Sequence, residues 1–156
     1  MADLTHLDNE GNAHMVDVAG REVTTRTATA VGKVKLSSEV VKALRDNTVP
    51  KGDVLSAARL AGIMATKKTS DLIPLCHPIS IHGVTVELQV EDDGVAISAT
   101  VKTADRTGVE MEALTAVSVA GLTVIDMVKA MDPFAAITDV YMTQKDGGRN
   151  GKWSRS

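Results

Sequence analysis

The sequence predicts an α+β fold, in which helices cover one face of an antiparallel sheet. Two parts of the chain favour this fold most directly. Residues 82–90 and 95–103 alternate between apolar and polar side chains and are joined by the turn sequence DDG, which is typical of a β-hairpin. Residues 109–131 have the apolar spacing of a long helix. A chain of 156 residues fits one domain, and we expect a single domain over residues 1–156.

One strand and two helices are expected before the hairpin. Residues 22–36 are rich in β-branched side chains and alternate locally, which predicts a strand. Ser37 is a suitable N-cap for a helix over 38–47, and Asp53 is a suitable N-cap for a second helix over 54–68.

The helix expected over 109–131 is apolar on nearly every side. Its segment 113–125 carries no charge, but this segment is shorter than the roughly 20 residues that span a bilayer. We therefore expect no membrane contact and expect the helix to be buried, partly by another subunit. One stripe of this helix contains Met111, Leu114, Ser118, Gly121, Ile125 and Val128.

A last strand is expected over 136–144, followed by a basic, glycine-rich tail over about 145–156. We expect this tail and the N-terminal segment of about 1–14 to be flexible. The order of strand, two helices, two strands, helix and strand matches the split βαβ arrangement with one extra helix. This is a ferredoxin-like fold with the helices on one face of the sheet.

Charge and composition limit the classes of ligand. The chain has 17 basic and 20 acidic residues and a formal charge of -3, so nothing general favours nucleic acid, and an anion must meet a local cluster of cations. Only Phe134, Tyr141 and Trp153 are aromatic, too few for a base-stacking platform, so the core must consist of aliphatic side chains. One cysteine allows no internal disulfide, and the first residues lack a signal-peptide pattern, so we expect a cytoplasmic protein.

The segment DLIPLCHPIS, residues 71–80, holds a cysteine and a histidine between two prolines, which restrict the backbone on both sides. Cys76, His77 and His82 are too few for a closed zinc site, so we expect no metal there. Cys76 is better explained as a small buried apolar group. For His77, a functional role and an ordinary hydrogen-bonded loop position remain open.

Lys51 and Gly52 precede the helix that Asp53 caps, where free backbone amides and the helix dipole would favour a phosphate. Alternatively, Asp53 alone caps the helix and the lysine is solvated. Lys67 and Lys68 at the other end of this helix, just before the histidine loop, strengthen the anion hypothesis.

Two pairs of charges mark the ends of the long helix. Asp126 and Lys129 form either an ordinary ion pair or a proton-transfer site in which burial raises the pKa of the carboxyl. Glu110 and Glu112 complement the helix dipole at the other end. Because they are two residues apart, we expect at most one of them to point into a given site.

The chain resembles the molybdenum cofactor biosynthesis protein C family, the cyclic pyranopterin monophosphate synthases. The likeness is most specific in three segments: LIPLCHP, PKGDV and TGVEMEALTAVSVAGLTVIDMVKA. It extends from LTHLDNEGNAHMVDV near the start to KDGGRNG near the end. Arg106 stands where many relatives have a lysine, and VIDMVKA lacks a cysteine that many relatives carry.

The resemblance implies a ferredoxin-like subunit in a homohexamer, a trimer of dimers, with active sites between subunits. It implies that a radical S-adenosylmethionine enzyme supplies 3′,8-cyclo-7,8-dihydroguanosine 5′-triphosphate. This substrate is converted to cyclic pyranopterin monophosphate and pyrophosphate by acid/base catalysis, without a redox cofactor. Whether Mg²⁺ accompanies the triphosphate stays open.

The resemblance also implies roles for individual residues. The implied catalytic residues are Lys51, Asp126 and Lys129. The implied substrate contacts are Leu75, Cys76, His77, Met111 and Glu112, and the implied triphosphate ligands are Arg26, Lys67 and Lys145. Two alternatives remain: a ferredoxin-like regulatory module that binds a nucleotide without catalysis, and an inert scaffold for the upstream enzyme.

Overall fold

The computed structural model describes residues 4–156, so the first three residues of the predicted N-terminal segment lie outside the described part. Its helices and strands are β1 (Thr24–Lys35), α1 (Ser38–Asp46), α2 (Val54–Thr66), α3 (Thr69–Leu72), β2 (Gly83–Glu91), β3 (Gly94–Asp105), α4 (Glu110–Val128), β4 (Ala136–Asp146) and β5 (Trp153–Ser154). The strands form one antiparallel sheet in the order β2-β3-β1-β4-β5. The first four strands have the ferredoxin-like arrangement, which confirms the predicted fold class.

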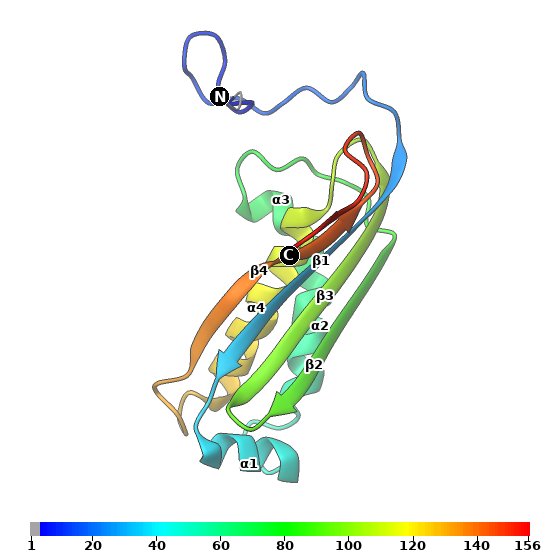
Figure 1. Cartoon of the computed structure of the whole chain (residues 1–156). Coiled ribbons are helices and arrows are strands. Elements are labelled where there is room, and N and C mark those ends of the chain that lie inside the picture. Colours follow the sequence, from blue (N-terminus) through cyan, green and yellow to red (C-terminus); the bar gives the residue numbers. More distant parts are fainter. Residues whose placement is uncertain (1–3) are drawn as a thin grey trace.

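The helices form one layer against the sheet. Figure 1 shows α2 and α4 side by side behind the strands, while α1 lies beyond the end of the sheet where β1 finishes. The predicted N-caps are confirmed, because the Ser37 side chain accepts a hydrogen bond from Val40 N and the Asp53 side chain accepts one from Ser56 N. The one-turn helix α3 was not predicted.

The core is built from small aliphatic side chains, as the near absence of aromatic residues requires. The largest fully buried side chains are valines and threonines. Small residues also let the helices approach closely: a Cβ at Gly62 of α2 would stand 3.0 Å from the carbonyl oxygen of Ala116 in α4. This close packing fixes the position of α2 relative to α4. It thereby also fixes the positions of the segments at the ends of both helices.

The stripe of α4 that the sequence pattern marks is only partly buried in this chain. Met111 is exposed, Leu114, Ser118 and Ile125 are half-buried, and only Gly121 and Val128 are buried. The buried face instead runs through Ala113, Ala116, Val117, Ala120, Val124 and Val128. The helix is apolar on nearly every side, so periodicity alone could not select the face that meets the sheet.

Helix α4 is long and apolar enough to cross a membrane by length and composition, with a mean hydropathy of 1.6. Half of that stretch is buried inside the molecule, where it packs on α2 and on the strands. The helix is thus explained as the core helix of the domain. Leu122 on its outer side is 57% exposed.

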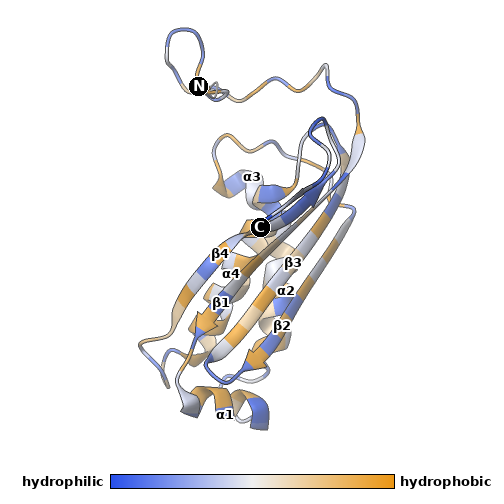
Figure 2. Cartoon of the chain, viewed as in Figure 1, coloured by the Kyte–Doolittle hydropathy of each residue, from blue (hydrophilic) through white to orange (hydrophobic). Residues whose placement is uncertain are grey.

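Part of the predicted C-terminal tail belongs to the sheet. β4 continues to Asp146, two residues beyond the predicted end, and the short strand β5 pairs Trp153 with Lys145 and Ser154 with Gln144. The loop between β4 and β5 therefore lies at the same end of the molecule as α3 and the start of α4 (Figure 1). In Figure 2, hydrophilic residues gather at this end.

Candidate active site

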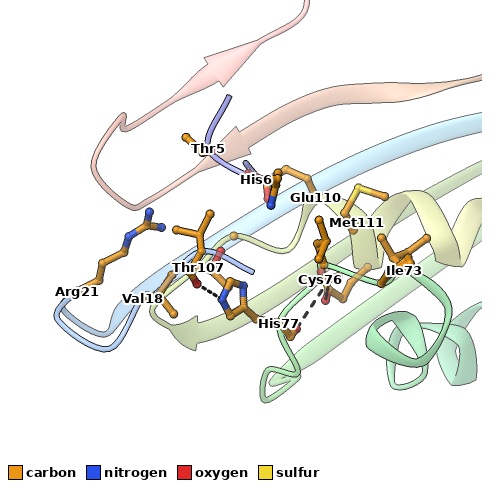
Figure 3. A pocket seen from close by; sticks show the side chains of 15 residues that line it. Thr5, His6, Val18, Arg21, Ile73, Cys76, His77, Thr107, Glu110 and Met111 are labelled. Carbon is orange, nitrogen blue, oxygen red and sulfur yellow. Dashed lines mark hydrogen bonds between the residues drawn. The ribbon is translucent and has the colours of Figure 1, made fainter. Parts of the chain in front are cut away.

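A cavity of about 580 Å³ lies at the N-terminal end of α4. Its walls are the loop after α3, the first turn of α4, the residues just before it and the N-terminal segment (Figure 3). The loop is shaped by a turn in which Cys76 N donates to the Ile73 carbonyl at 3.1 Å. Pro74 occupies the position of this turn that a proline favours, so the sequence IPLC itself directs Leu75 and Cys76 to the cavity.

His77 is half-buried at the edge of the cavity, where it joins two segments of the chain. Its Nε2 lies 2.5 Å from the Val16 carbonyl oxygen. The nitrogen that meets this carbonyl must be the protonated one, so the contact selects a tautomer and fixes the ring. Figure 3 shows His77 beside Val18 and Thr107. His77 therefore makes an ordinary loop hydrogen bond and also lines a cavity, and its functional role stays a prediction.

Glu112 places a carboxyl group at the base of the cavity. The residue is 2% exposed, Oε1 lies 3.6 Å from the Cys76 sulfur, and Oε2 has no hydrogen-bond partner within the described residues. Burial raises the pKa of Glu112. Burial, followed by the negative charge of Glu112, raises the pKa of Cys76 to about 11. Cys76 is therefore a thiol at neutral pH, which agrees with a framework role and opposes a nucleophilic one.

Glu110 and Met111 also line this cavity, so the expectation that only one of the two glutamates points into a site is wrong. The two side chains do leave the helix on different sides. The cavity, however, borders the free end of α4, and three successive residues of its first turn, Glu110, Met111 and Glu112, line it. Residues two apart on a helix point in different directions, so they cannot share a site on its flank. They can share a site that lies at the end of the helix.

A second, smaller cavity of about 190 Å³ adjoins the first one. Both cavities are lined by Arg21, Thr107, Gly108 and Glu110. The smaller one adds two of the predicted phosphate ligands, Arg26 and Lys145, together with Arg149 from the loop between β4 and β5. Lys145 Nζ lies 3.3 Å from Glu110 Oε1. Neither Arg21 nor Arg149 was identified from the sequence, although the basic, glycine-rich segment KDGGRNG could have suggested the latter.

The predicted catalytic group lies at the other end of α4. Lys51 Nζ donates to the Asp126 backbone carbonyl at 2.9 Å and lies 3.8 Å from Asp126 Oδ2, while Lys129 Nζ lies 2.6 Å from Asp126 Oδ1. The Asp126 side chain is 60% exposed. The hydrogen bond from Lys129, together with the charges of both lysines, lowers the pKa of Asp126. Of the two alternatives for Asp126 and Lys129, the ordinary ion pair is therefore confirmed, and the buried carboxyl with a raised pKa is wrong for this chain by itself.

The predicted site residues thus form one group around the two adjoining cavities, one distant group at the other end of α4, and one outlier. From Glu112 to Asp126 the helix rises about 21 Å, at roughly 1.5 Å per residue. Leu75, Cys76, His77, Met111 and Glu112 line the larger cavity, and Arg26 and Lys145 line the smaller one. Lys51, Asp126 and Lys129 form the distant group, which we call the lysine–aspartate cluster. Lys67 caps the C-terminus of α2, is exposed and lines neither cavity.

The fold and the site define a ferredoxin-like α+β protein with a mostly apolar cavity, a buried carboxyl group and an adjoining basic cavity. Comparison with known proteins gives the particular family. The chain belongs to the MoaC family, whose model matches residues 15–148.

Several curated proteins are similar over nearly the whole chain. Three of these are named cyclic pyranopterin monophosphate synthase. The one from Streptomyces avermitilis is 65% identical over 153 residues, covering 98% of this chain and 90% of the relative. The one from a Nocardioides species is 64% identical, covering 97% of this chain and 95% of the relative. The one from Corynebacterium glutamicum is 54% identical and covers 99% of both chains.

Proposed function

We propose that this protein is a cyclic pyranopterin monophosphate synthase of molybdenum cofactor biosynthesis. It converts 3′,8-cyclo-7,8-dihydroguanosine 5′-triphosphate to cyclic pyranopterin monophosphate and releases pyrophosphate. The observation that carries this proposal is the joining of two unlike cavities, one apolar with a buried carboxyl and one basic. The near full-length similarity to proteins of that name supports it.

The purine-derived ring is assigned to the larger cavity. Its 580 Å³ falls within the range of roughly 300–1,000 Å³ that is typical of small-molecule sites. The free oxygen of Glu112 would accept a hydrogen bond from an N–H group of the ring, which relieves an unsatisfied buried acceptor. Leu75, Cys76, His77 and Met111 shape the walls around this contact.

The phosphates are assigned to the smaller cavity. Arg26 and Lys145 would neutralise the triphosphate there, since guanidinium and ammonium groups form strong charge-assisted hydrogen bonds with phosphate oxygens. Lys67 joins this set only if a second subunit brings it close. Mg²⁺ would enter with the triphosphate as its counter-ion, and the proposed chemistry needs no redox cofactor.

The lysine–aspartate cluster is assigned to catalysis across a subunit interface. A proton-transfer group must come within about 3 Å of the atom it serves, whereas about 21 Å of helix separates the cluster from Glu112 in one chain. We therefore propose that the cluster of one subunit completes the cavity of another, within a homohexamer built as a trimer of dimers. In such a site Lys51 and Lys129 would exchange protons with the substrate, and Asp126 would hold both lysines in place.

The test is an incubation of the purified chain with the cyclised nucleotide, with separate assays for the pterin and for pyrophosphate. Formation of both in equal amounts is the expected result. A regulatory module that only binds the nucleotide is the alternative favoured by the exposed position of the lysine–aspartate cluster. It would bind the nucleotide and release no pyrophosphate. An inert scaffold would bind none. A radical S-adenosylmethionine enzyme in the cytoplasm is the proposed source of the substrate.

A further inference from the structure

The smaller cavity gathers more positive charge than the described chain neutralises. Four cationic side chains line it, those of Arg21, Arg26, Lys145 and Arg149, against the two carboxylates of Glu110 and Asp146. This local excess of cations stands out in a chain whose formal charge is -3. Like charges that share a small space repel one another, so their convergence is unfavourable until an anion binds between them.

The carboxylates leave the guanidinium groups unpaired. Glu110 is engaged by Lys145 at 3.3 Å, and Asp146 Oδ1 accepts a hydrogen bond from Gly147 N at 2.8 Å. Within residues 4–156, no ion pair involves any of the three arginines. Among the described residues, the Arg26 side chain donates one hydrogen bond, to the Arg106 carbonyl at 3.4 Å, and its Nε is buried without a partner.

Glycines bring the third arginine to this place. Gly147 and Gly148 have φ values of 92° and 76°, which side-chain-bearing residues rarely adopt. A Cβ at Gly147 would collide with the Thr25 carbonyl, and a Cβ at Gly148 would collide with the Arg26 guanidinium. Glycine is therefore needed for this segment to lie directly on Arg26, and Arg149 follows in the next position.

The size of the cavity restricts what it can hold. Its volume of 190 Å³ is below the roughly 300 Å³ at which sites for drug-sized molecules begin. A purine ring belongs in the larger neighbour, whereas a short chain of phosphates suits the smaller space. Arginine favours such a ligand because its planar fork matches two phosphate oxygens at once.

We propose that the segment Asp146–Gly151 is a pyrophosphate-binding loop, in which Arg149 and Arg21 are further phosphate ligands. This inference rests on the proposed function, since pyrophosphate is the co-product of that reaction. It adds that the smaller cavity binds inorganic pyrophosphate by itself, without the purine part. Free pyrophosphate should then compete with the cyclised nucleotide.

The experiment is calorimetric titration of the full chain with inorganic pyrophosphate, with inorganic monophosphate as the comparison ligand. The native chain should bind pyrophosphate more tightly than monophosphate. Arg149→Gln should weaken pyrophosphate binding about tenfold or more, because it removes charge-assisted hydrogen bonds. Arg149→Lys should recover part of the loss, because it restores the charge without the fork.

Two further variants separate a phosphate ligand from a change in the fold. Lys152→Gln removes an equal charge from an exposed residue that does not line the cavity, and should leave pyrophosphate binding within about twofold. Gly148→Ala keeps every arginine but forces a Cβ against Arg26, and should weaken pyrophosphate binding as well. Circular dichroism of each variant should match that of the native chain.

Equal pyrophosphate affinity in the native chain and in Arg149→Gln would overturn the inference. A native chain that forms the pterin but binds no free pyrophosphate would also overturn the inference. The proposed function would stand in that case. A native chain that binds pyrophosphate through Arg149 but forms no pterin would support the loop and refute the synthase.

Discussion

The two ends of helix α4 offer opposite environments to acidic side chains. At the N-terminal end, Glu112 is 2% exposed and its burial raises the pKa of the carboxyl. At the C-terminal end, Asp126 is 60% exposed and two lysines lower the pKa of the carboxyl. The N-terminal end borders a cavity that holds a buried carboxyl group, and we call it the enclosed end. The C-terminal end carries the exposed lysine–aspartate cluster, and we call it the open end. The comparison teaches that the two groups of predicted site residues differ in burial and charge, and under the proposed function they are two halves of a site at opposite ends of one helix.

The largest expected effect concerns the open end. Lys51→Ala or Lys129→Ala should lower the rate of pterin formation about a hundredfold or more, since proton transfer by a placed side chain typically contributes 10²–10⁴-fold. The proposed hexamer should persist, because loss of one exposed ion pair costs the fold little. The measurements are single-turnover pterin formation and analytical ultracentrifugation.

Lys42→Ala is the matched control for these variants. Lys42 is also an exposed lysine paired with an aspartate, Asp46, but it lies on α1 and lines neither cavity. Its activity should equal that of the native chain. Full activity in both Lys51→Ala and Lys129→Ala would refute the catalytic role of the open cluster.

Mixing two defective chains tests whether the two ends meet across subunits. Lys51→Ala and Glu112→Ala should each be inactive alone. Random co-assembly at equal amounts should restore about a quarter of the native activity, because that share of interfaces joins two intact halves. The measurement is pterin formation by co-expressed, differently tagged chains. No recovery in verified mixed assemblies would place both halves in one chain.

A moderate effect is expected on stability at the enclosed end. Because the folded-state pKa of Glu112 is raised from its ordinary value of 4.5, the folded chain holds the proton more tightly than the unfolded chain does. The free energy of unfolding therefore falls as pH rises above that value. Glu112→Gln removes this penalty and should stabilise the fold by about 1 kcal/mol near pH 7, with the gain shrinking towards pH 4.

Urea unfolding of Glu112→Gln and of the native chain at several pH values measures this difference. Glu110→Gln is a suitable control, because Glu110 is already paired with Lys145 at 3.3 Å. A gain that grew as pH fell would contradict the assigned direction of the Glu112 pKa.

The smallest expected effect is on stability at the open end. Asp126→Asn should leave the melting temperature at pH 7 almost unchanged, because exposed ion pairs contribute little to folding. The contribution that does exist is present above the ordinary pKa of 3.8 and is lost as pH falls, since the pKa of Asp126 is lowered in the folded chain. Differential scanning calorimetry measures it. A large drop in the melting temperature would mean that Asp126 holds the fold together.

Local patterns predicted most of the fold. The hairpin of β2 and β3 and the caps Ser37 and Asp53 are short-range features, and each was found as expected. The buried face of α4 was missed, because a helix that is apolar all round carries no periodic signal. The strand β5 was missed as well, because two residues in a polar segment have no strand pattern.

The candidate site was predicted less completely than the fold. The family resemblance pointed to Glu112, His77 and the lysine–aspartate cluster, and the predicted helix already placed Glu112 and Asp126 at its two ends, about 21 Å apart. The sequence could not show which other segments of the chain gather around each end. Arg21 and Arg149 were overlooked because their role depends on three distant segments meeting at one cavity. The sequence left open whether Asp126 is buried, because its neighbours in sequence are apolar, whereas those neighbours pack against the core and Asp126 is exposed.

The pairing of β5 with β4 has a practical consequence. Trp153, the only tryptophan of the chain, lies opposite Lys145 on the adjacent strand and is 41% exposed. Indole emission responds to nearby charge and hydration, so this residue is an intrinsic optical reporter beside the basic cavity. Stopped-flow fluorescence of the unlabelled enzyme could therefore follow the arrival and departure of phosphates directly in time.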